Sequence, residues 1–126
     1  MFTKIITPIF CDTDALGHVS NTTIPSWLES ARDPLFQYFT PDLDPKKWRL
    51  IIARIEMDFL AELFYGTDIE IKTCLSHLGN SSSQEIWQNQ TIAIKGLTIL
   101  IHFDYRARKA QPIPDDIRGQ LQEHLS

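Results

Sequence analysis

The spacing of hydrophobic positions changes once along the chain, near residue 49. Before that point, six of them recur at steps of three and four residues, which indicates one face of a helix: Ile24, Trp27, Leu28, Ala31, Leu35 and Phe39. A proline inside a helix costs about 3 kcal/mol, so Pro34 predicts a kink, with Asp33 capping a second helical segment. Residues 21–23 supply candidate caps for the first segment, in which Pro25 is tolerated only in the first turn.

After residue 49 the pattern becomes β-like and predicts strands over residues 50–59 and 69–75. Gly79, Asn80 and the serines after them predict a turn into a strand over 84–95, which Gly96 separates from a last strand over 97–105. A short first strand over 5–10 has Pro8 at an edge or bulge. Asp115 is expected to cap a short final helix through Leu125. This order predicts an α+β fold, with one helix packed on an antiparallel meander.

Composition bounds the class of protein. The 126 residues fit one domain over 1–126, and 43% hydrophobic with 22% charged residues is ordinary for a globular protein. The net charge of −4 and the single basic run at 106–109 argue against a nucleic-acid partner. No apolar stretch approaches the roughly 20 residues that span a bilayer, and no signal peptide is expected from the first residues.

The cysteines and histidines do not indicate an exported protein or a metal-binding protein. With no export signal, Cys11 and Cys74 are expected to be reduced thiols of a cytoplasmic protein. The chain has no CxxC pair and four scattered histidines, so no metal site is expected. Because one helix covers only part of such a sheet, we expect a homo-oligomer to protect its exposed faces and edges.

The segment most informative about chemistry precedes the predicted helix and reads Asp12-Thr13-Asp14-Ala15-Leu16-Gly17-His18-Val19-Ser20-Asn21. A carboxylate can attack a carbonyl carbon or activate a water for that attack. The free N–H groups at a helix start can hold the anion that develops. The segment therefore points to acyl-group chemistry.

This segment, followed by Trp27-Leu28-Glu29-Ser30-Ala31-Arg32, resembles the hotdog-fold acyl-CoA thioesterases of the 4-hydroxybenzoyl-CoA thioesterase type. Further similarity lies in Asp58-Phe59-Leu60, Gly66-Thr67-Asp68 and the stretch from Arg108 to Pro114. The resemblance implies a five-stranded antiparallel sheet wrapped around one long central helix. It also implies dimers or tetramers with active sites at the protomer interface. The implied reaction hydrolyses an acyl-CoA or acyl-carrier-protein thioester to a free acid and a thiol. It needs no metal or organic cofactor, since coenzyme A belongs to the substrate.

By the same resemblance, Asp14 matches the catalytic carboxylate, as general base or nucleophile, and the backbone N–H near Asn21 matches the oxyanion donor. Gly17 is expected to permit an unusual backbone angle or a close approach. Asp12 is expected to organise the loop by accepting backbone hydrogen bonds. His18 fixes the loop or lines the substrate entrance, with acid–base catalysis as the alternative.

The chain departs from the family pattern where the helix begins. Ser20 replaces an asparagine and Ile24 replaces an aromatic residue. Because Ile24 precedes a proline, it is biased away from helical dihedrals, and the helix is expected to start late.

Each charged residue considered outside the motif has two candidate roles. Glu29 either supports the site or pairs with Arg32 one turn along the helix. Arg106, Arg108 and Lys109 are candidate contacts for the phosphates of coenzyme A, or else a solvated face.

Two rival functions remain at this stage. One is a hotdog hydratase or dehydratase acting on acyl thioesters, and the other is a non-catalytic acyl-thioester-binding protein. The hydratases pair an acid with a histidine differently and lack this opening motif. The losses at Ser20 and Ile24 are what favours the non-catalytic reading.

Overall fold

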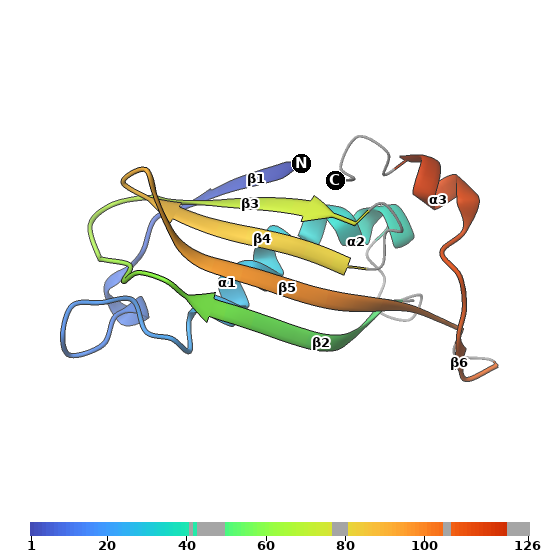
Figure 1. Ribbon diagram of the computed structural model, residues 1–126, viewed down its shortest axis with the longest axis horizontal. Coiled ribbons are helices and arrows are strands. Elements are labelled where there is room, and N and C mark those ends of the chain that lie inside the picture. The colour runs from blue at the N-terminus through green and yellow to red at the C-terminus, as the bar shows by residue number, and fades with distance from the viewer. Residues whose placement is uncertain (41, 43–49, 77–80, 105–106, 121–126) are drawn as a thin grey trace.

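The computed structural model describes residues 1–40, 42, 50–76, 81–104 and 107–120. A long antiparallel sheet packs two short helices against one face (Figure 1). Its order is β1-β3-β4-β5-β2, and a short strand, β6, adds to β5. The strands are β1 (Phe2–Ile6), β2 (Leu50–Phe59), β3 (Ile69–Leu75), β4 (Ser81–Gln88), β5 (Thr91–Asp104) and β6 (Lys109–Ala110). The predicted α+β class with five main strands is confirmed.

The strand order differs from the meander expected from the sequence. Among the five main strands, only β3, β4 and β5 follow one another as neighbours, whereas β2 pairs with β5 at the opposite edge, from Leu50 against His102 to Phe59 against Ile94. The neighbouring position beside β3 is taken by β1. Residues 60–68 therefore carry the chain from the edge strand β2 across to β3, which lies next to the other edge strand, β1.

The helical stretch is divided as Pro34 predicted. The first helix, α1 (Ile24–Ala31), and the second, α2 (Asp33–Phe39), are separated at Arg32, so the one long helix expected from the resemblance is two shorter ones. Asp33 is the first residue of α2 rather than its cap, and neither helix start has a side-chain cap hydrogen bond. The Asp33 carboxylate lies in the first turn of α2, where the positive end of the helix dipole stabilises a negative charge. Pro25 stands in the first turn of α1 as expected, although Ile24 is already helical despite preceding it.

Two hydrophobic clusters fill the space between helices and sheet. One lies under α1 and includes Trp27, Leu28, Ile71, Ile86 and Ile94. The other lies between α2 and α3 (Asp115–Gln120) and includes Leu35, Phe39, Leu75, Leu100 and Ile117. The first cluster is tight at Gly96, where an added Cβ would lie 3.2 Å from Leu28 Cδ1. Gly96 thus lets α1 approach the sheet closely.

Several predicted boundaries are wrong. The reversal between β4 and β5 falls at Asn89 and Gln90, with φ of 51° and 64°, and Gly96 lies inside β5. Two positive φ values in succession give a hairpin turn whose twist matches that of the strands. The serines expected in a turn belong to β4, while the turn predicted at 79–80 lies outside the described residues.

The first and last elements also differ from expectation. Strand β1 ends at Ile6, and residues after Pro8 form a 3-10 turn, Phe10–Asp12, because proline has no N–H for a strand ladder. Asp115 begins α3, which the structure describes to Gln120; the rest of the predicted helix lies outside the described residues. No helix in the described ranges has the length and apolar character needed to cross a membrane.

Candidate functional site

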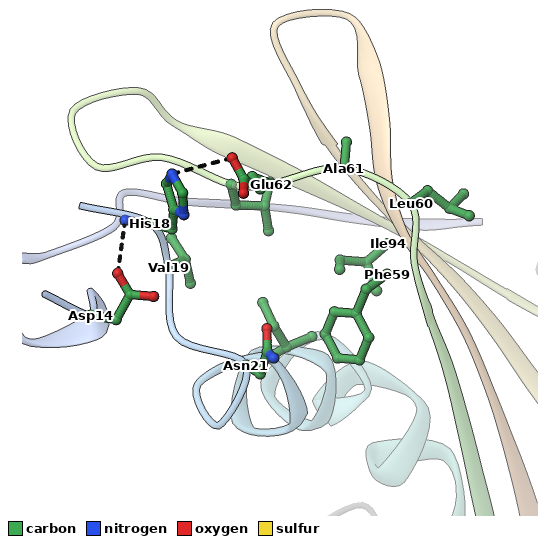
Figure 2. A pocket seen from close by; sticks show the side chains of 11 residues that line it. Asp14, His18, Val19, Asn21, Phe59, Leu60, Ala61, Glu62 and Ile94 are labelled. Atoms are coloured by element: carbon green, nitrogen blue, oxygen red, sulfur yellow. Dashed lines mark hydrogen bonds and ion pairs between the residues drawn. The ribbon is translucent and has the colours of Figure 1, made fainter. Parts of the chain in front are cut away.

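A cavity of about 400 Å³ lies where the loop before α1 meets the segment after β2 (Figure 2). Its polar lining consists of Asp14, His18, Asn21 and Glu62. Its apolar lining comes from α1, β5, the end of β2 and the two loops: Val19, Ile24, Phe59, Leu60, Ala61, Leu63 and Ile94. The Asp14 and Glu62 carboxylates thus border a half-open cavity whose lining combines polar groups with apolar side chains. Such a lining can hold an apolar group next to a carboxylate.

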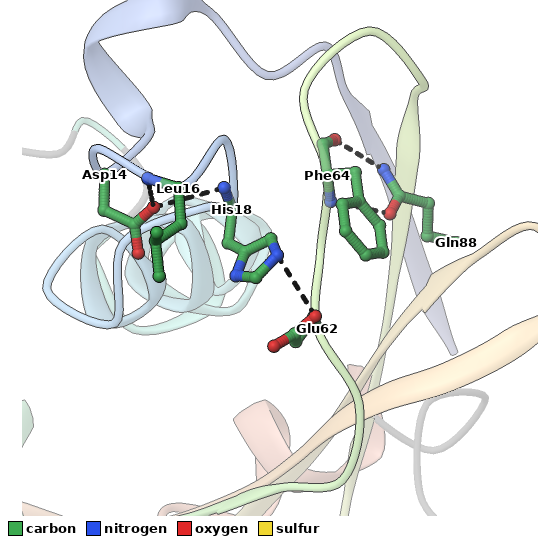
Figure 3. Close-up of polar contacts among 6 residues, drawn as sticks. All are labelled: Asp14, Leu16, His18, Glu62, Phe64 and Gln88. Atoms are coloured by element: carbon green, nitrogen blue, oxygen red, sulfur yellow. Dashed lines mark hydrogen bonds and ion pairs between the residues drawn. The ribbon is translucent and has the colours of Figure 1, made fainter.

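The Asp14 carboxylate is held by its own loop. Its Oδ1 accepts the backbone N–H of Leu16 at 2.8 Å and that of His18 at 3.2 Å (Figure 3). The Asp14 N–H donates to the His18 carbonyl at 2.8 Å, and the Gly17 N–H donates to the Asp14 carbonyl at 3.2 Å. Gly17 closes this turn with φ of +83°, a conformation L residues rarely adopt. Two amides therefore fix one carboxylate oxygen, and Oδ2 takes no part in these bonds.

Asp12 organises the same loop from its other side. Its Oδ2 accepts the Ile9 N–H at 2.9 Å. Its carbonyl accepts the Ser20 N–H at 2.7 Å and the Thr23 hydroxyl at 3.3 Å. The side-chain bond is of the kind expected from the sequence, and the carbonyl ties the loop to the start of α1.

Asn21 lies in the turn of residues 21–23 that leads into α1, and it lines the cavity. Within the part of the chain that the structure describes, its backbone N–H donates to no protein group. An N–H without an acceptor, next to the positive end of a helix, is available to an oxyanion.

Glu62 is the site residue that sequence reasoning missed. Its Oε2 lies 3.2 Å from His18 Nε2, and the two side chains are 62% and 27% exposed (Figure 2). The segments carrying them pair through the Val19 N–H, which donates to the Leu63 carbonyl at 2.7 Å. Glu62 stands in no motif, so only the pairing of two distant segments reveals it.

Glu29 is not part of this cavity. It is exposed on α1, and the ion pair with Arg32 expected from the sequence does not form in the described structure. Arg32 is buried and its Nη1 donates to Gln84 Oε1 at 2.9 Å instead. Burial lowers the pKa of the Arg32 guanidinium, while attraction to Glu29 and Asp33 opposes that shift.

The basic residues lie far from the cavity within one chain. Arg108, with φ of 54°, and Lys109 are exposed at the β5–β6 turn. This turn is at the opposite end of the sheet from the loop that carries Asp14 (Figure 1). Arg106 lies outside the described residues. A single protomer therefore does not bring Arg108 or Lys109 to Asp14.

Comparison with solved structures confirms the hotdog fold. The structure of a predicted thioesterase from Bacillus stearothermophilus is 41% identical, with a TM-score of 0.93, and the match covers 99% of this chain and 96% of that one. A thioesterase from Thermus thermophilus, complexed with coenzyme A and Zn, is 28% identical, with a TM-score of 0.83 and coverage of 96% and 97%. A Staphylococcus aureus protein in complex with CoA has a TM-score of 0.82 over 98% and 82% of the chains, but its 13% identity supports the fold alone.

Comparison with protein families agrees with the comparison of structures. A search of curated proteins found no match to the chain. The family model that matches is broader than the 4-hydroxybenzoyl-CoA type, which stays a prediction. It describes the thioesterase-like superfamily and matches residues 10–121, so the chain belongs to that superfamily.

Proposed function

We propose that the protein hydrolyses an acyl-CoA thioester to a free acid and coenzyme A. The observation that carries this proposal is the Asp14 carboxylate, which two loop amides hold in the lining of a cavity that also presents apolar side chains. Further support comes from the superfamily match and from the Thermus thermophilus relative complexed with coenzyme A.

In the proposed reaction, the thioester carbonyl lies between Asp14 and the Asn21 N–H. As general base, Asp14 takes a proton from water, and the hydroxide adds to the carbonyl carbon. The Asn21 N–H stabilises the oxyanion, a contribution of about 3 kcal/mol for one such donor. The C–S bond then breaks, and the thiolate receives the proton. As nucleophile, Asp14 adds to the carbonyl carbon, the C–S bond breaks and the thiolate leaves and takes a proton from solvent; water then hydrolyses the mixed anhydride to the free acid and restores the Asp14 carboxylate. Neither route needs a metal or an organic cofactor.

The test is thiol release from a panel of acyl-CoA substrates by wild type and Asp14→Asn. Asparagine keeps an oxygen that accepts from the Leu16 and His18 amides, so the loop stays in place while the charge is lost. We expect a fall in kcat of about 10²- to 10⁴-fold. Asp116→Asn, an exposed acid on α3, is the matched control and keeps full activity. Near-normal turnover by Asp14→Asn would reject the proposal.

We also propose that the active unit is a homodimer paired along β2. This strand is a sheet edge, and an open edge is a template for another strand. Its apolar residues Ile52, Ile55 and Phe59 are 38%, 44% and 49% exposed. A two-fold axis at Ile55 would set Arg54 opposite the partner subunit's Glu56, and each charge would then face its opposite.

Antiparallel pairing of this kind would bring the β5–β6 turn of the partner toward the cavity. Strand β2 runs from the β6 end of the sheet to the cavity, where Phe59 is part of the lining (Figure 1). The partner subunit's Arg108 and the partner subunit's Lys109 would then reach the phosphates of coenzyme A, contacts that one protomer cannot make.

Mixed dimers test this arrangement. Asp14→Asn and the double variant Arg108→Ala/Lys109→Ala are each expected to hydrolyse acyl-CoA poorly. If the basic residues act on the partner's site, a mixed dimer regains one intact site and about half of wild-type activity per dimer. If they act within their own chain, mixing restores nothing.

A further inference from the structure

The cavity is bounded by two segments that lie outside the long strands and helices. One carries Asp14 and His18, and the other comprises residues 60–67. They are joined by the contact between His18 Nε2 and Glu62 Oε2, by the bond from the Val19 N–H to the Leu63 carbonyl, and by a β-bridge between His18 and Phe64. The position of Asp14 therefore depends on what holds the 60–67 segment.

The start of that segment is held by the Leu60 and Ala61 N–H groups, which donate to the Ala93 carbonyl of β5, and its end is held by one side chain of β4. Gln88, the last residue of β4, is 6% exposed. Its Oε1 accepts the Phe64 N–H at 2.9 Å, and its Nε2 donates to the Phe64 carbonyl at 2.9 Å (Figure 3). The same Nε2 also donates to the Thr67 carbonyl at 2.9 Å. The two bonds to Phe64 repeat the reciprocal pattern of an antiparallel strand pair. Gln88 thus makes three of the four hydrogen bonds available to a side-chain amide, all of them to the turn of residues 64–67.

From Phe64 the contacts continue to Asp14. The rings of Phe64 and His18 meet edge to face, with centroids 5.2 Å apart. The His18 N–H in turn donates to Asp14 Oδ1. Gln88 touches neither the cavity nor Asp14, yet three successive contacts connect it to the carboxylate.

We propose that Gln88 is a positioning residue for the active site: it clamps the 64–67 turn and through Phe64 and His18 holds the Asp14 loop. This role rests on the proposed function, because the site that Gln88 positions is the one assigned there. The effect of the Gln88 hydrogen bonds on the loop can be measured without any hydrolysis assay. Only an amide fits the clamp, because the turn presents one N–H donor and two carbonyl acceptors. Glutamate would repel both carbonyls, and methionine would bond to none of the three groups.

The test compares Gln88→Met and Gln88→Glu with Gln84→Met as a matched control. Gln84 has the same side chain, lies on the same face of β4 and is 2% exposed, but its bonds go to Arg32, Thr73 and Leu28. The control therefore reports a loss of stability without a loss of the clamp. All measurements are made at a temperature where each variant is folded by circular dichroism.

The first readout is hydrogen exchange at the Leu16, His18 and Val19 amides, which are remote from the deleted bonds. We expect exchange to become about tenfold faster in both Gln88 variants and unchanged relative to global stability in Gln84→Met. The second readout is thioesterase kinetics, where kcat falls about tenfold with KM changed less, because a displaced Asp14 lowers the rate of the chemical step.

The outcomes separate the two proposals. Unchanged exchange at the three amides, or equal changes in Gln84→Met, overturns the clamp whatever the activity. A fall in kcat shared by Gln84→Met would likewise assign the effect to stability. If wild-type protein releases no thiol from any acyl-CoA while exchange still accelerates in the Gln88 variants, the proposed function fails and the clamp stands.

Discussion

Replacing Arg32 by methionine tests the polar contact that anchors the helix pair to the sheet. Arg32 lies between α1 and α2 and is 2% exposed. Its Nη1 donates to Gln84 Oε1 at 2.9 Å and to the Thr98 hydroxyl at 3.2 Å. Gln84 Nε2 in turn donates to the Leu28 carbonyl at 2.9 Å and to the Thr73 hydroxyl at 3.1 Å. One buried cation and one amide thus link α1 to three strands.

Two opposing terms set the size of the effect. Methionine removes two charge-assisted hydrogen bonds, each worth roughly 1.5–3 kcal/mol, and leaves two acceptors without a donor. It also removes a buried cation that has no carboxylate within ion-pair distance in the described residues, which returns part of its desolvation cost. We expect a net loss of about 2–4 kcal/mol in the free energy of unfolding, or roughly 10–15 °C in Tm.

A double-mutant cycle with Gln84→Met separates these terms. Gln84→Met alone leaves the Arg32 cation with one acceptor fewer, whereas the double variant removes donor and acceptor together. The double variant should therefore cost about 2 kcal/mol less than the sum of the single variants, measured by urea unfolding followed by circular dichroism. Arg108→Met, at an exposed arginine, is the control and should change stability by less than about 0.5 kcal/mol. Additive costs, or a single variant as stable as wild type, would refute the reasoning.

Three further changes test other parts of the structure. Gly96→Ala should destabilise the protein by about 1–3 kcal/mol in urea unfolding, because its Cβ would press on Leu28 at 3.2 Å; adding Leu28→Ala should remove most of that strain while opening a cavity. Gly17→Ala should cost about 1–2 kcal/mol because of its φ of +83°, and should lower thiol release by displacing the Asp14 loop. Ile55→Lys should shift the mass seen in sedimentation from dimer to monomer without unfolding the chain, since Ile55 is 44% exposed in one protomer; an unchanged mass would reject pairing along β2.

The elements that were predictable from the sequence are those whose pattern is local. The three- and four-residue spacing marks α1 and α2, and Pro34 marks the break between them. The alternation in residues 69–75 matches β3 at both ends, and 50–59 matches β2. In α1, α2 and β3 a regular hydrophobic pattern runs the length of the element, so periodicity alone identifies it, whereas the alternation of β2 is interrupted between Ile52 and Arg54.

Strand β4 was mispredicted because its buried face is largely polar. Ser82, Gln84 and Gln88 are all buried, and the two glutamines find their hydrogen-bond partners only in the fold. Serines before Gln84 therefore looked like a turn, and the real turn at Asn89 and Gln90 looked like a strand interior. A hydrophobicity pattern contains no signal for side chains whose partners are distant along the chain.

The candidate site likewise combines residues that a local motif marks with residues that only the fold brings together. Asp14, Gly17, His18 and Asn21 occupy one short loop, so a motif could mark them together. Glu62 and Gln88 reach the loop only through the pairing of residues 60–67 with it.

Strand β4 carries two buried amides whose hydrogen bonds go to different parts of the fold. Gln84 and Gln88 are four residues apart, and even spacing in a strand places both side chains on the inner face. The first amide binds the helix pair through Arg32 and Leu28, and the second binds the turn that borders the cavity. Both are fixed by the same strand, yet they share no hydrogen-bond partner. Substitution of Gln84 should therefore lower mainly the free energy of unfolding, and substitution of Gln88 should lower mainly the rate of thioester hydrolysis.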